Sequence, residues 1–249
     1  MTLKKIVQFG GIIMISLFFS CSTPPPQQPQ KNETVVLLHG LARSKKSMNK
    51  MAIYLKASGY RVINIGYPST SAPIEQLEKD LFKKLNPQIK NETTVHFVTH
   101  SMGGIILWHY LAHHSITNLG KVVMLAPPSQ GSEIPDKLGR IFLFKWINGP
   151  AGNQLGTGSD SIPNQLPPPN FPLGIIAGDR SVNLILSCLI PGPDDGKVSL
   201  ARVKPKTYTD YIQIHATHPF ISKNKTAIQQ TIYFLNHGHF KKEQNILNK

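Results

Sequence analysis

Ser101 is the residue whose surroundings most favour covalent chemistry. It lies in the segment THSMGG (99–104), between a run typical of a buried strand and a run typical of a buried helix. A serine at such a junction occupies a tight turn that raises its hydroxyl above the sheet edge, where the Met102 N–H and the helix N-terminus also point. Thr99 replaces the first glycine of the usual G-x-S-x-G turn. We predict a nucleophilic serine, the alternative being a serine that only caps a helix.

A histidine and a glycine follow the first predicted strand, in the segment LHGLA (38–42). Glycine allows the backbone to turn so that the next N–H, that of Leu41, faces a bound carbonyl group. Together with the Met102 N–H it would hold an oxyanion, the charged oxygen that forms when a serine attacks an acyl group. The alternative is that Gly40 only forms a turn after the strand. The oxyanion role of Leu41 is therefore predicted only if Ser101 is a nucleophile.

Activation of such a serine needs a histidine and an acid, and both types occur later in the chain. His218 comes directly after the last predicted strand, from where it can reach over the sheet edge to Ser101 as a general base. The acid has three candidates, Asp179, Asp194 and Asp195. All three also suit plain turns, so position alone leaves the choice open.

Strand-like and helix-like segments alternate along the body of the chain. Short apolar runs are typical of buried strands, and amphipathic or apolar helical patterns separate them. The expected strands cover residues 35–38, 60–65, 94–99, 122–125, 173–177 and 208–214, and the expected helices cover 47–57, 74–85, 102–113 and 226–235. This alternation predicts an α/β protein with a mostly parallel, doubly wound sheet.

Two long stretches, residues 127–170 and 178–205, interrupt this alternation and hold many Pro and Gly residues. Insertions of this length in a compact domain are usually lids or binding loops. The first stretch contains the apolar run 141–146, which predicts either a cap that contacts a bound acyl group or a helix packed on the sheet. We expect a short cap or loop insertion at 127–170, within one domain that covers residues 34–240.

The N-terminus has the pattern of a targeting segment. Residues 1–20 combine two lysines with an apolar stretch that is short for a membrane-spanning helix and long enough for a signal-peptide core. They lead into FFSC (18–21), which resembles the lipobox of bacterial lipoproteins and predicts a diacylated Cys21; ordinary secretory cleavage near Ser20 is the alternative. Residues 21–33, rich in Pro and Gln, are expected to be an extended tether. These features predict a membrane-anchored lipoprotein of the cell envelope.

The net charge and the composition indicate which kinds of binding partner the protein can have. The 249 residues include 27 Lys and Arg against 13 Asp and Glu, a formal net charge of +14. This excess favours anionic lipid surfaces. The basic residues are scattered and form no stripe with interleaved aromatic residues, so no nucleic-acid partner is expected.

Metal and cofactor patterns are weak. His109 and His113 are four residues apart on a predicted helix, but no glutamate lies between them in an H-E-x-x-H pattern. No Gly-rich nucleotide motif occurs either. We expect neither a metal nor a cofactor, and these patterns leave the oligomeric state open.

Six segments carry a resemblance to the bacterial triacylglycerol-lipase-like branch of the α/β-hydrolases, and within it to the small acetyltransferase/hydrolase-like lipases. They are VVLLHGLARS (35–44), YRVINIGYPST (60–70), VHFVTHSMGG (95–104), VVMLAPPSQGSE (122–133), GPDDGKVSL (192–200) and HATHPFI (215–221). In that branch an Asp-Gly-x-Val loop supplies the acid, which maps onto Asp195. The resemblance further implies a nucleophile at Ser101, a base at His218, oxyanion donors at Leu41 and Met102, and a minimal α/β-hydrolase fold.

With this resemblance, the residues predict a serine esterase or lipase that hydrolyses acyl esters or lipids at a membrane surface. An acyltransferase or thioesterase would use the same acyl-enzyme and differ in the acceptor. A lipid-anchored binding lipoprotein without catalysis is a further alternative, because a fold alone does not prove activity. Turnover of a p-nitrophenyl ester that depends on Ser101 and His218 would distinguish an enzyme from a binding module.

Overall fold

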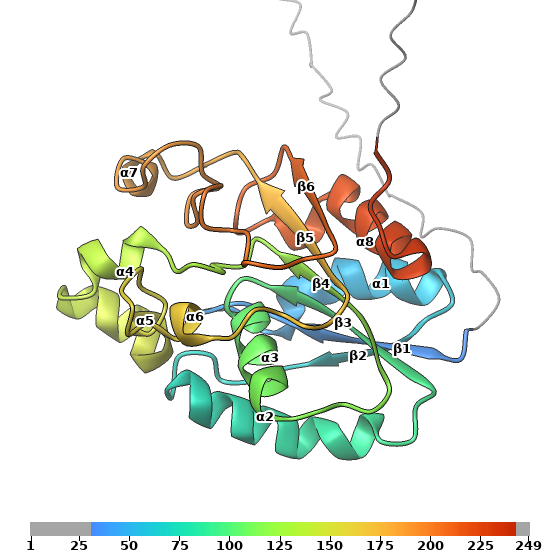
Figure 1. The fold of residues 1–249 in the computed structure, drawn as a ribbon. Helices are drawn as coiled ribbons and strands as arrows, with labels where there is room; N and C mark the ends of the chain where they lie inside the picture. The colour runs from blue at the N-terminus through green and yellow to red at the C-terminus, as the bar shows by residue number, and fades with distance from the viewer. Residues whose placement is uncertain (1–30, 243–249) are drawn as a thin grey trace, which may run out of the picture.

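One sheet of six parallel strands organises residues 31–242, the part of the chain that the computed structural model describes, apart from the side chains of residues 143–145 and 184–185. The strand order is β2-β1-β3-β4-β5-β6 (Figure 1). The strands are β1 (Glu33–Leu38), β2 (Arg61–Ile65), β3 (Thr94–His100), β4 (Leu119–Leu125), β5 (Leu173–Gly178) and β6 (Asp210–Ile214). Because every neighbouring pair is parallel, the carboxyl ends of the strands meet at one edge of the sheet.

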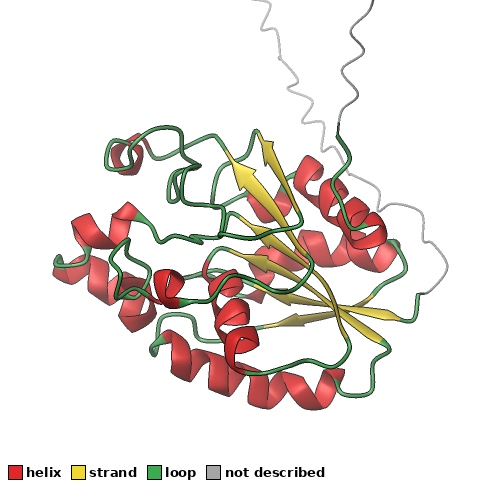
Figure 2. Ribbon diagram, in the orientation of Figure 1, coloured by secondary structure: helices red, strands yellow, loops and turns green. Residues whose placement is uncertain are grey.

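Helices cover both faces of this sheet (Figure 2). They are the 3-10 turns η1 (Lys45–Met48) and η2 (Ile221–Lys223), and the α-helices α1 (Asn49–Ala57), α2 (Ile74–Ile89), α3 (Met102–His113), α4 (Glu133–Leu138), α5 (Phe142–Asn153), α6 (Ile162–Gln165), α7 (Leu184–Ser187) and α8 (Lys225–His237). Helices α1 and α8 pack on one face, and α2 and α3 pack on the other. The predicted doubly wound α/β class is confirmed, with all six strands parallel.

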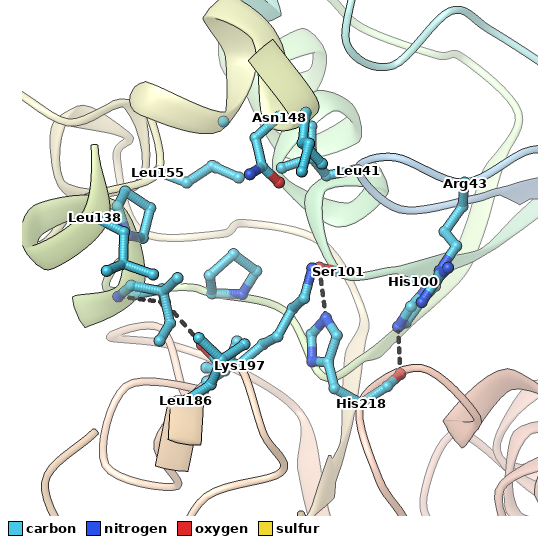
Figure 3. A pocket seen from close by; sticks show the side chains of 17 residues that line it. Leu41, Arg43, His100, Ser101, Leu138, Asn148, Leu155, Leu186, Lys197 and His218 are labelled. Carbon is cyan, nitrogen blue, oxygen red and sulfur yellow. Dashed lines mark hydrogen bonds between the residues drawn. The ribbon is translucent and has the colours of Figure 1, made fainter. Parts of the chain in front are cut away.

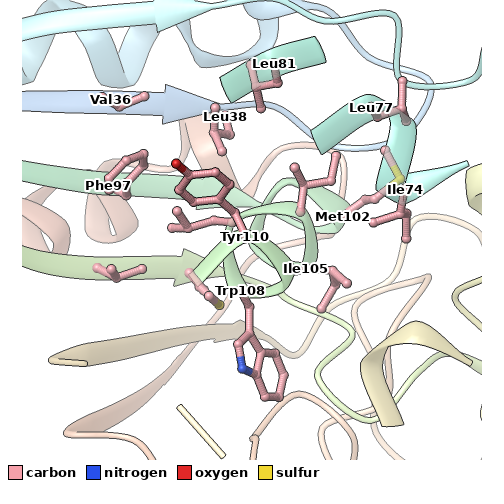
Figure 4. Close-up of a cluster of buried hydrophobic side chains, with 14 of the residues drawn as sticks. Val36, Leu38, Ile74, Leu77, Leu81, Phe97, Met102, Ile105, Trp108 and Tyr110 are labelled. Carbon is pink, nitrogen blue, oxygen red and sulfur yellow. The ribbon is translucent and has the colours of Figure 1, made fainter. Parts of the chain in front are cut away.

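Alternate side chains of the strands supply two apolar cores. In β1, Val36 and Leu38 belong to the core under α2 and α3, part of which Figure 4 shows. Val35 and Leu37 belong to the core under α1 and α8, and all four side chains are fully buried. Burial on both faces is the reason that the β1 sequence is continuously apolar instead of alternating.

Helix α3 is nearly all core. Eight of its twelve residues are buried, in agreement with a sequence that is apolar on most sides. Its N-terminus directly follows β3, the third strand in the sheet order. Because the helix cannot move without opening the core, the residue at the junction, Ser101, is fixed in place.

The predicted insertion between β4 and β5 contains three short helices, α4, α5 and α6, which lie beyond the carboxyl edge of the sheet (Figure 1). Helix α5 bends at Gly149, whose φ is 64°, just before Pro150. A Cβ at Gly149 would lie 1.8 Å from the carbonyl oxygen of Thr70, so this bend requires glycine. The insertion is therefore a helical cap with a fixed bend.

The predicted signal peptide, Cys21 and most of the predicted tether lie outside the described residues. The ordered domain begins before the predicted boundary at residue 34: the Lys31 N–H donates to the Gly59 carbonyl oxygen at 2.8 Å, and β1 starts at Glu33. Within residues 31–242, no helix combines the length and the hydropathy that crossing a bilayer would require.

Candidate active site

Ser101 occupies a strained turn between β3 and α3. Its φ is 53° and its ψ is −127°, a backbone conformation that residues with a side chain rarely adopt. The Ser101 N–H donates to the Leu125 carbonyl oxygen at 2.9 Å, and the Gly104 N–H donates to the Ser101 carbonyl oxygen at the same distance. The turn predicted at the strand–helix junction is therefore present, and the structure places Ser101 at the carboxyl edge of the sheet.

The two glycines after Met102 explain how Thr99 is tolerated in the turn. A Cβ on Gly103 would lie 2.6 Å from the His39 carbonyl oxygen, so α3 approaches β1 as closely as backbones allow. A Cβ on Gly104 would lie 3.0 Å from Thr99 Oγ1. The absent side chain of Gly104 thus provides the space that the Thr99 side chain occupies.

A chain of hydrogen bonds links Ser101 to His218 and Asp195. His218 Nε2 is 2.9 Å from Ser101 Oγ, and His218 Nδ1 is 2.8 Å from Asp195 Oδ2. The other carboxylate oxygen, Oδ1, accepts the backbone N–H groups of Lys197 at 3.0 Å and Val198 at 2.9 Å. All three residues of the chain are at least nine-tenths buried. The arrangement can transfer a proton from Ser101 to His218 and stabilise the resulting imidazolium.

The other two candidate acids lie elsewhere. Asp179 contacts His215 Nδ1 at 2.9 Å and accepts a hydrogen bond from Gln213. Asp194 Oδ1 accepts from the Ser187 hydroxyl and the Gly196 N–H, as expected of a turn residue. Of the three carboxylates, only Asp195 pairs with His218.

His100, next to the serine, fixes the position of His218. Its Nε2 lies 2.9 Å from the His218 carbonyl oxygen, so Nε2 carries the proton and donates it. Burial, and to a lesser extent the nearby His218 ring, holds the pKa of His100 well below the ordinary histidine value. His100 is therefore a neutral residue that anchors the His218 backbone.

The predicted oxyanion segment lies against the serine. A Cβ on Gly40 would be 3.0 Å from Ser101 Cβ. The Tyr67 N–H donates to His39 Nε2 at 3.3 Å, which leaves the proton on Nδ1, 3.0 Å from the Gly40 carbonyl oxygen. Because a trans peptide points its C=O and N–H in opposite directions, the Leu41 N–H is turned away from the His39 ring.

The two predicted oxyanion donors are available. Within residues 31–242, neither the Leu41 N–H nor the Met102 N–H donates a hydrogen bond to another protein group. Met102 begins α3, where the positive end of the helix dipole is directed at the serine turn. Free N–H groups at a helix start and in an adjacent glycine loop are suited to a negatively charged oxygen.

A cavity of about 210 Å³ opens beside Ser101 and His218 (Figure 3). Much of its wall is apolar and comes from the cap and the loops: Leu41, Pro128, Ile134, Pro135, Leu138, Ile147, Leu155, Leu186 and Val198. The run 141–146 was expected to contact a bound acyl group. Instead, Ile141, Phe142 and Trp146 are exposed and do not line the cavity. The cap residues that line the cavity come from α4 and from α5 on both sides of its bend, with Ile147 and Asn148 before Gly149 and Gly152 after it.

Ser132 connects the cap to the segment that carries the acid. Its Oγ accepts from the Ile134 N–H at 3.2 Å and so caps α4. The same hydroxyl donates to the Lys197 carbonyl oxygen at 2.7 Å, two residues after Asp195. One side chain thus belongs both to the cap and to the acid loop.

Arg43, Lys197 and Asn148 are among the cavity residues that were not predicted from the sequence. Arg43 stands two residues after Leu41, and Lys197 stands two residues after Asp195. That closeness to predicted site residues is the signal that could have identified the two cations. Asn148 precedes the bend of α5, which the sequence did not predict.

The histidine pair on α3 takes other roles. His109 Nδ1 contacts the Glu78 carboxylate, and His113 Nδ1 lies 2.8 Å from the His109 carbonyl oxygen. Among the described residues, no three His, Cys, Asp or Glu side chains come together as potential metal ligands.

Comparisons with known proteins agree with this architecture. The model of the α/β-hydrolase fold family matches residues 33–152, which include β1, β3, Ser101 and most of the cap. No curated protein sequence matches significantly. The mature lipase BlEst2 of Bacillus licheniformis superposes with a TM-score of 0.68 at 21% identity, covering 85% of this chain and 95% of that one.

Two more distant structures share the fold. The phospholipase PlaB of Legionella pneumophila has a TM-score of 0.53 at 15% identity, covering 69% of this chain and 45% of that one. The RedJ thioesterase of Streptomyces coelicolor has a TM-score of 0.53 at 11% identity, covering 90% and 98%. Identities this low establish the fold alone. The chain has a minimal α/β-hydrolase fold, and the family match over residues 33–152 supports the α/β-hydrolase superfamily.

Proposed function

We propose that this protein is a serine hydrolase that cleaves acyl esters through an acyl-enzyme on Ser101. The carrying observation is the hydrogen-bond chain from Ser101 through His218 to Asp195 at the edge of an apolar cavity. A serine that merely capped α3 would not require a buried histidine–carboxylate pair. The Ser101 side chain also makes no capping hydrogen bond to the helix.

The first half-reaction acylates the serine. Ser101 Oγ attacks the acyl carbon while its proton passes to His218 Nε2, and Asp195 stabilises the imidazolium through Nδ1–H. The Leu41 and Met102 N–H groups hold the oxyanion. The tetrahedral intermediate collapses, the bond to the leaving oxygen breaks, and His218 returns its proton to the departing alcohol.

The second half-reaction uses water in place of the alcohol. His218 takes a proton from water, the hydroxide attacks the acyl-enzyme, and Ser101 recovers its proton as the carboxylic acid leaves. A thioester donor or another acceptor would follow the same steps. The apolar cavity wall suits the acyl chain of either donor, and the cavity volume of about 210 Å³ suits a short one.

Covalent labelling tests this proposal. We expect a fluorophosphonate to label the folded wild-type protein and p-nitrophenyl butyrate to be hydrolysed. Ser101→Ala should abolish both, because the attacking oxygen is lost, whereas the exposed Ser71→Ala should retain both. A folded wild type that resists labelling, or turnover that survives in Ser101→Ala, would contradict the proposal.

A further inference from the structure

Two cationic side chains line the cavity beside Ser101 without an anionic partner. They are Arg43, which follows the oxyanion segment, and Lys197, in the loop of Asp195. Within the described chain, no hydrogen bond or ion pair engages the Arg43 guanidinium or the Lys197 ammonium. Among the residues whose side chains the structure describes, no Asp or Glu lines the cavity. The fold thus leaves two positive charges uncompensated next to the nucleophile.

Lys197 is the more constrained of the two cations, because it is half-buried. The carboxylate that influences it, Asp195, is already engaged by the His218 ring and by the backbone N–H groups of Lys197 and Val198. Burial, followed by the charge of Arg43, lowers the pKa of Lys197, and Asp195 only opposes this shift. The charge of Arg43 therefore disfavours the protonated form of Lys197, and an anion bound near both would relieve this.

The two cations approach Ser101 from different sides of the cavity. In Figure 3, Leu138 and Leu155 lie on one side of Ser101 and Arg43 lies on the other, while the Lys197 side chain extends toward Ser101. The cavity therefore presents a cation on each side of the attacking oxygen, next to its apolar wall. A molecule positioned for attack would contact the apolar wall and lie close to both cations.

We infer that Arg43 and Lys197 form a subsite for an anionic group of the substrate. This inference rests on the proposed function, because it places the anion on the molecule that Ser101 attacks. A guanidinium and an ammonium together bind phosphate or carboxylate oxygens through charge-assisted hydrogen bonds. The substrate class is an acyl ester that carries a phosphate or a carboxylate close to the bond that is cleaved.

Two matched pairs of soluble substrates test the subsite and separate its two possible sources of anion. The first pair is p-nitrophenyl butyrate and the mono-p-nitrophenyl ester of glutaric acid, which differ by a carboxylate on the acyl chain. The second pair is dihexanoylglycerol and dihexanoyl phosphatidylglycerol, both as monomers, which differ by the phosphodiester of a lipid head group. The measured quantity is the ratio of kcat/KM for the anionic over the neutral member.

The variants are Arg43→Met, Lys197→Met and the double change, with the exposed Lys46→Met, outside the cavity, as control. We expect the wild type to prefer the anionic member of at least one pair. Each single change should lower the ratio by about 10-fold, as for loss of one charge-assisted hydrogen bond, and the double change by more. Lys46→Met should preserve the ratio. Higher ionic strength should lower the ratio in the wild type but not in the double variant.

The outcomes separate the subsite from the proposed function. A wild type with no anionic preference in either pair overturns the subsite, as does a preference that survives in the double variant. A cation that only stabilised the oxyanion would slow neutral and anionic esters equally, leave the ratio unchanged and so overturn it too. Failure of the wild type to hydrolyse any of the four esters would instead count against the proposed function.

Discussion

Asp195 uses both carboxylate oxygens, one for His218 and one for its own loop. Asp195→Asn would keep the shape, but the amide can donate to His218 Nδ1 and so favour the tautomer with its proton on Nε2. That tautomer cannot accept the Ser101 proton. We expect kcat to fall by about 10⁴-fold, measured with p-nitrophenyl butyrate.

Asp179→Asn is the matched control, because the same chemical change is made at a carboxylate that pairs with the exposed His215. We expect it to retain most of the wild-type kcat. A crippled Asp179→Asn together with an active Asp195→Asn would show that the acid has been assigned to the wrong loop.

The residues of the candidate site differ in how well the sequence alone predicts them. Ser101 and His218 were predictable because Ser101 directly follows β3 and His218 lies four residues after the end of β6. A strand can be read from a local apolar run. Asp195 needed a resemblance to known proteins, because three carboxylates shared similar turns. Arg43 and Lys197 could not be paired in advance, because they are far apart in the chain and only the folded loops bring them to one cavity.

Packing of helix α3 against β1 is what positions the serine turn. A Cβ on Gly103 would lie 2.6 Å from the His39 carbonyl oxygen and 2.9 Å from that of Leu38, and backbone cannot yield cheaply. We expect Gly103→Ala to lower the free energy of unfolding by roughly 1–3 kcal/mol. It should also lower kcat, because the displaced helix carries Ser101 with it. Urea unfolding and ester turnover would measure both effects.

Gly66→Ala provides the comparison, because the nearest atom to its added Cβ is 3.7 Å away, on the Lys45 side chain. Its effect on the free energy of unfolding should stay below about 1 kcal/mol. Equal effects of the two substitutions would indicate that α3 does not need the close approach at Gly103.

The sequence predicted every strand of the sheet and the four helices that cover it. Each of these segments has a periodic or continuous pattern of apolar residues, because one or both of its faces are buried. The cap was predicted only as an insertion, and its detail could not follow from local pattern. The bend at Gly149 lies against the backbone of Thr70, which is distant in sequence, so no local pattern could predict it.

The whole domain should lose stability in mild acid because it buries neutral histidines. Burial lowers the pKa of His39, His96 and His100 below the ordinary value of 6.5. As the pH falls below about 6.5, the unfolded chain binds protons that the folded chain excludes, so unfolding becomes easier. We expect the free energy of unfolding to fall by about 2 kcal/mol between pH 7 and pH 5, measured by urea titration.

His100→Gln isolates one contribution to this pH dependence, because the glutamine amide can still donate to the His218 carbonyl oxygen but does not titrate. The variant should have a shallower decline of stability with acid than the wild type. Parallel pH profiles would show that His100 does not contribute.

Anchoring at a membrane is a proposal about the whole protein that rests on residues outside the described part of the chain. We propose that Cys21 carries the lipid, as the apolar run before it and the Pro/Gln-rich segment after it suggest. The wild type should sediment with membranes and incorporate a clickable fatty acid, whereas Cys21→Ser should incorporate none. Identical behaviour of the two as unlipidated protein would refute the anchor.

The Ser132 hydroxyl couples opening of the cap, through which substrate enters, to the position of the catalytic acid. It holds the start of α4 and the Lys197 carbonyl at once, and Asp195 lies two residues before that carbonyl. A cap that swings outward must either break this link or pull the acid away from His218. With the cap open, His218 would lack its hydrogen bond to Asp195, and closure of the cap over a bound molecule would restore it. Closure of the cap would therefore also activate the catalytic residues.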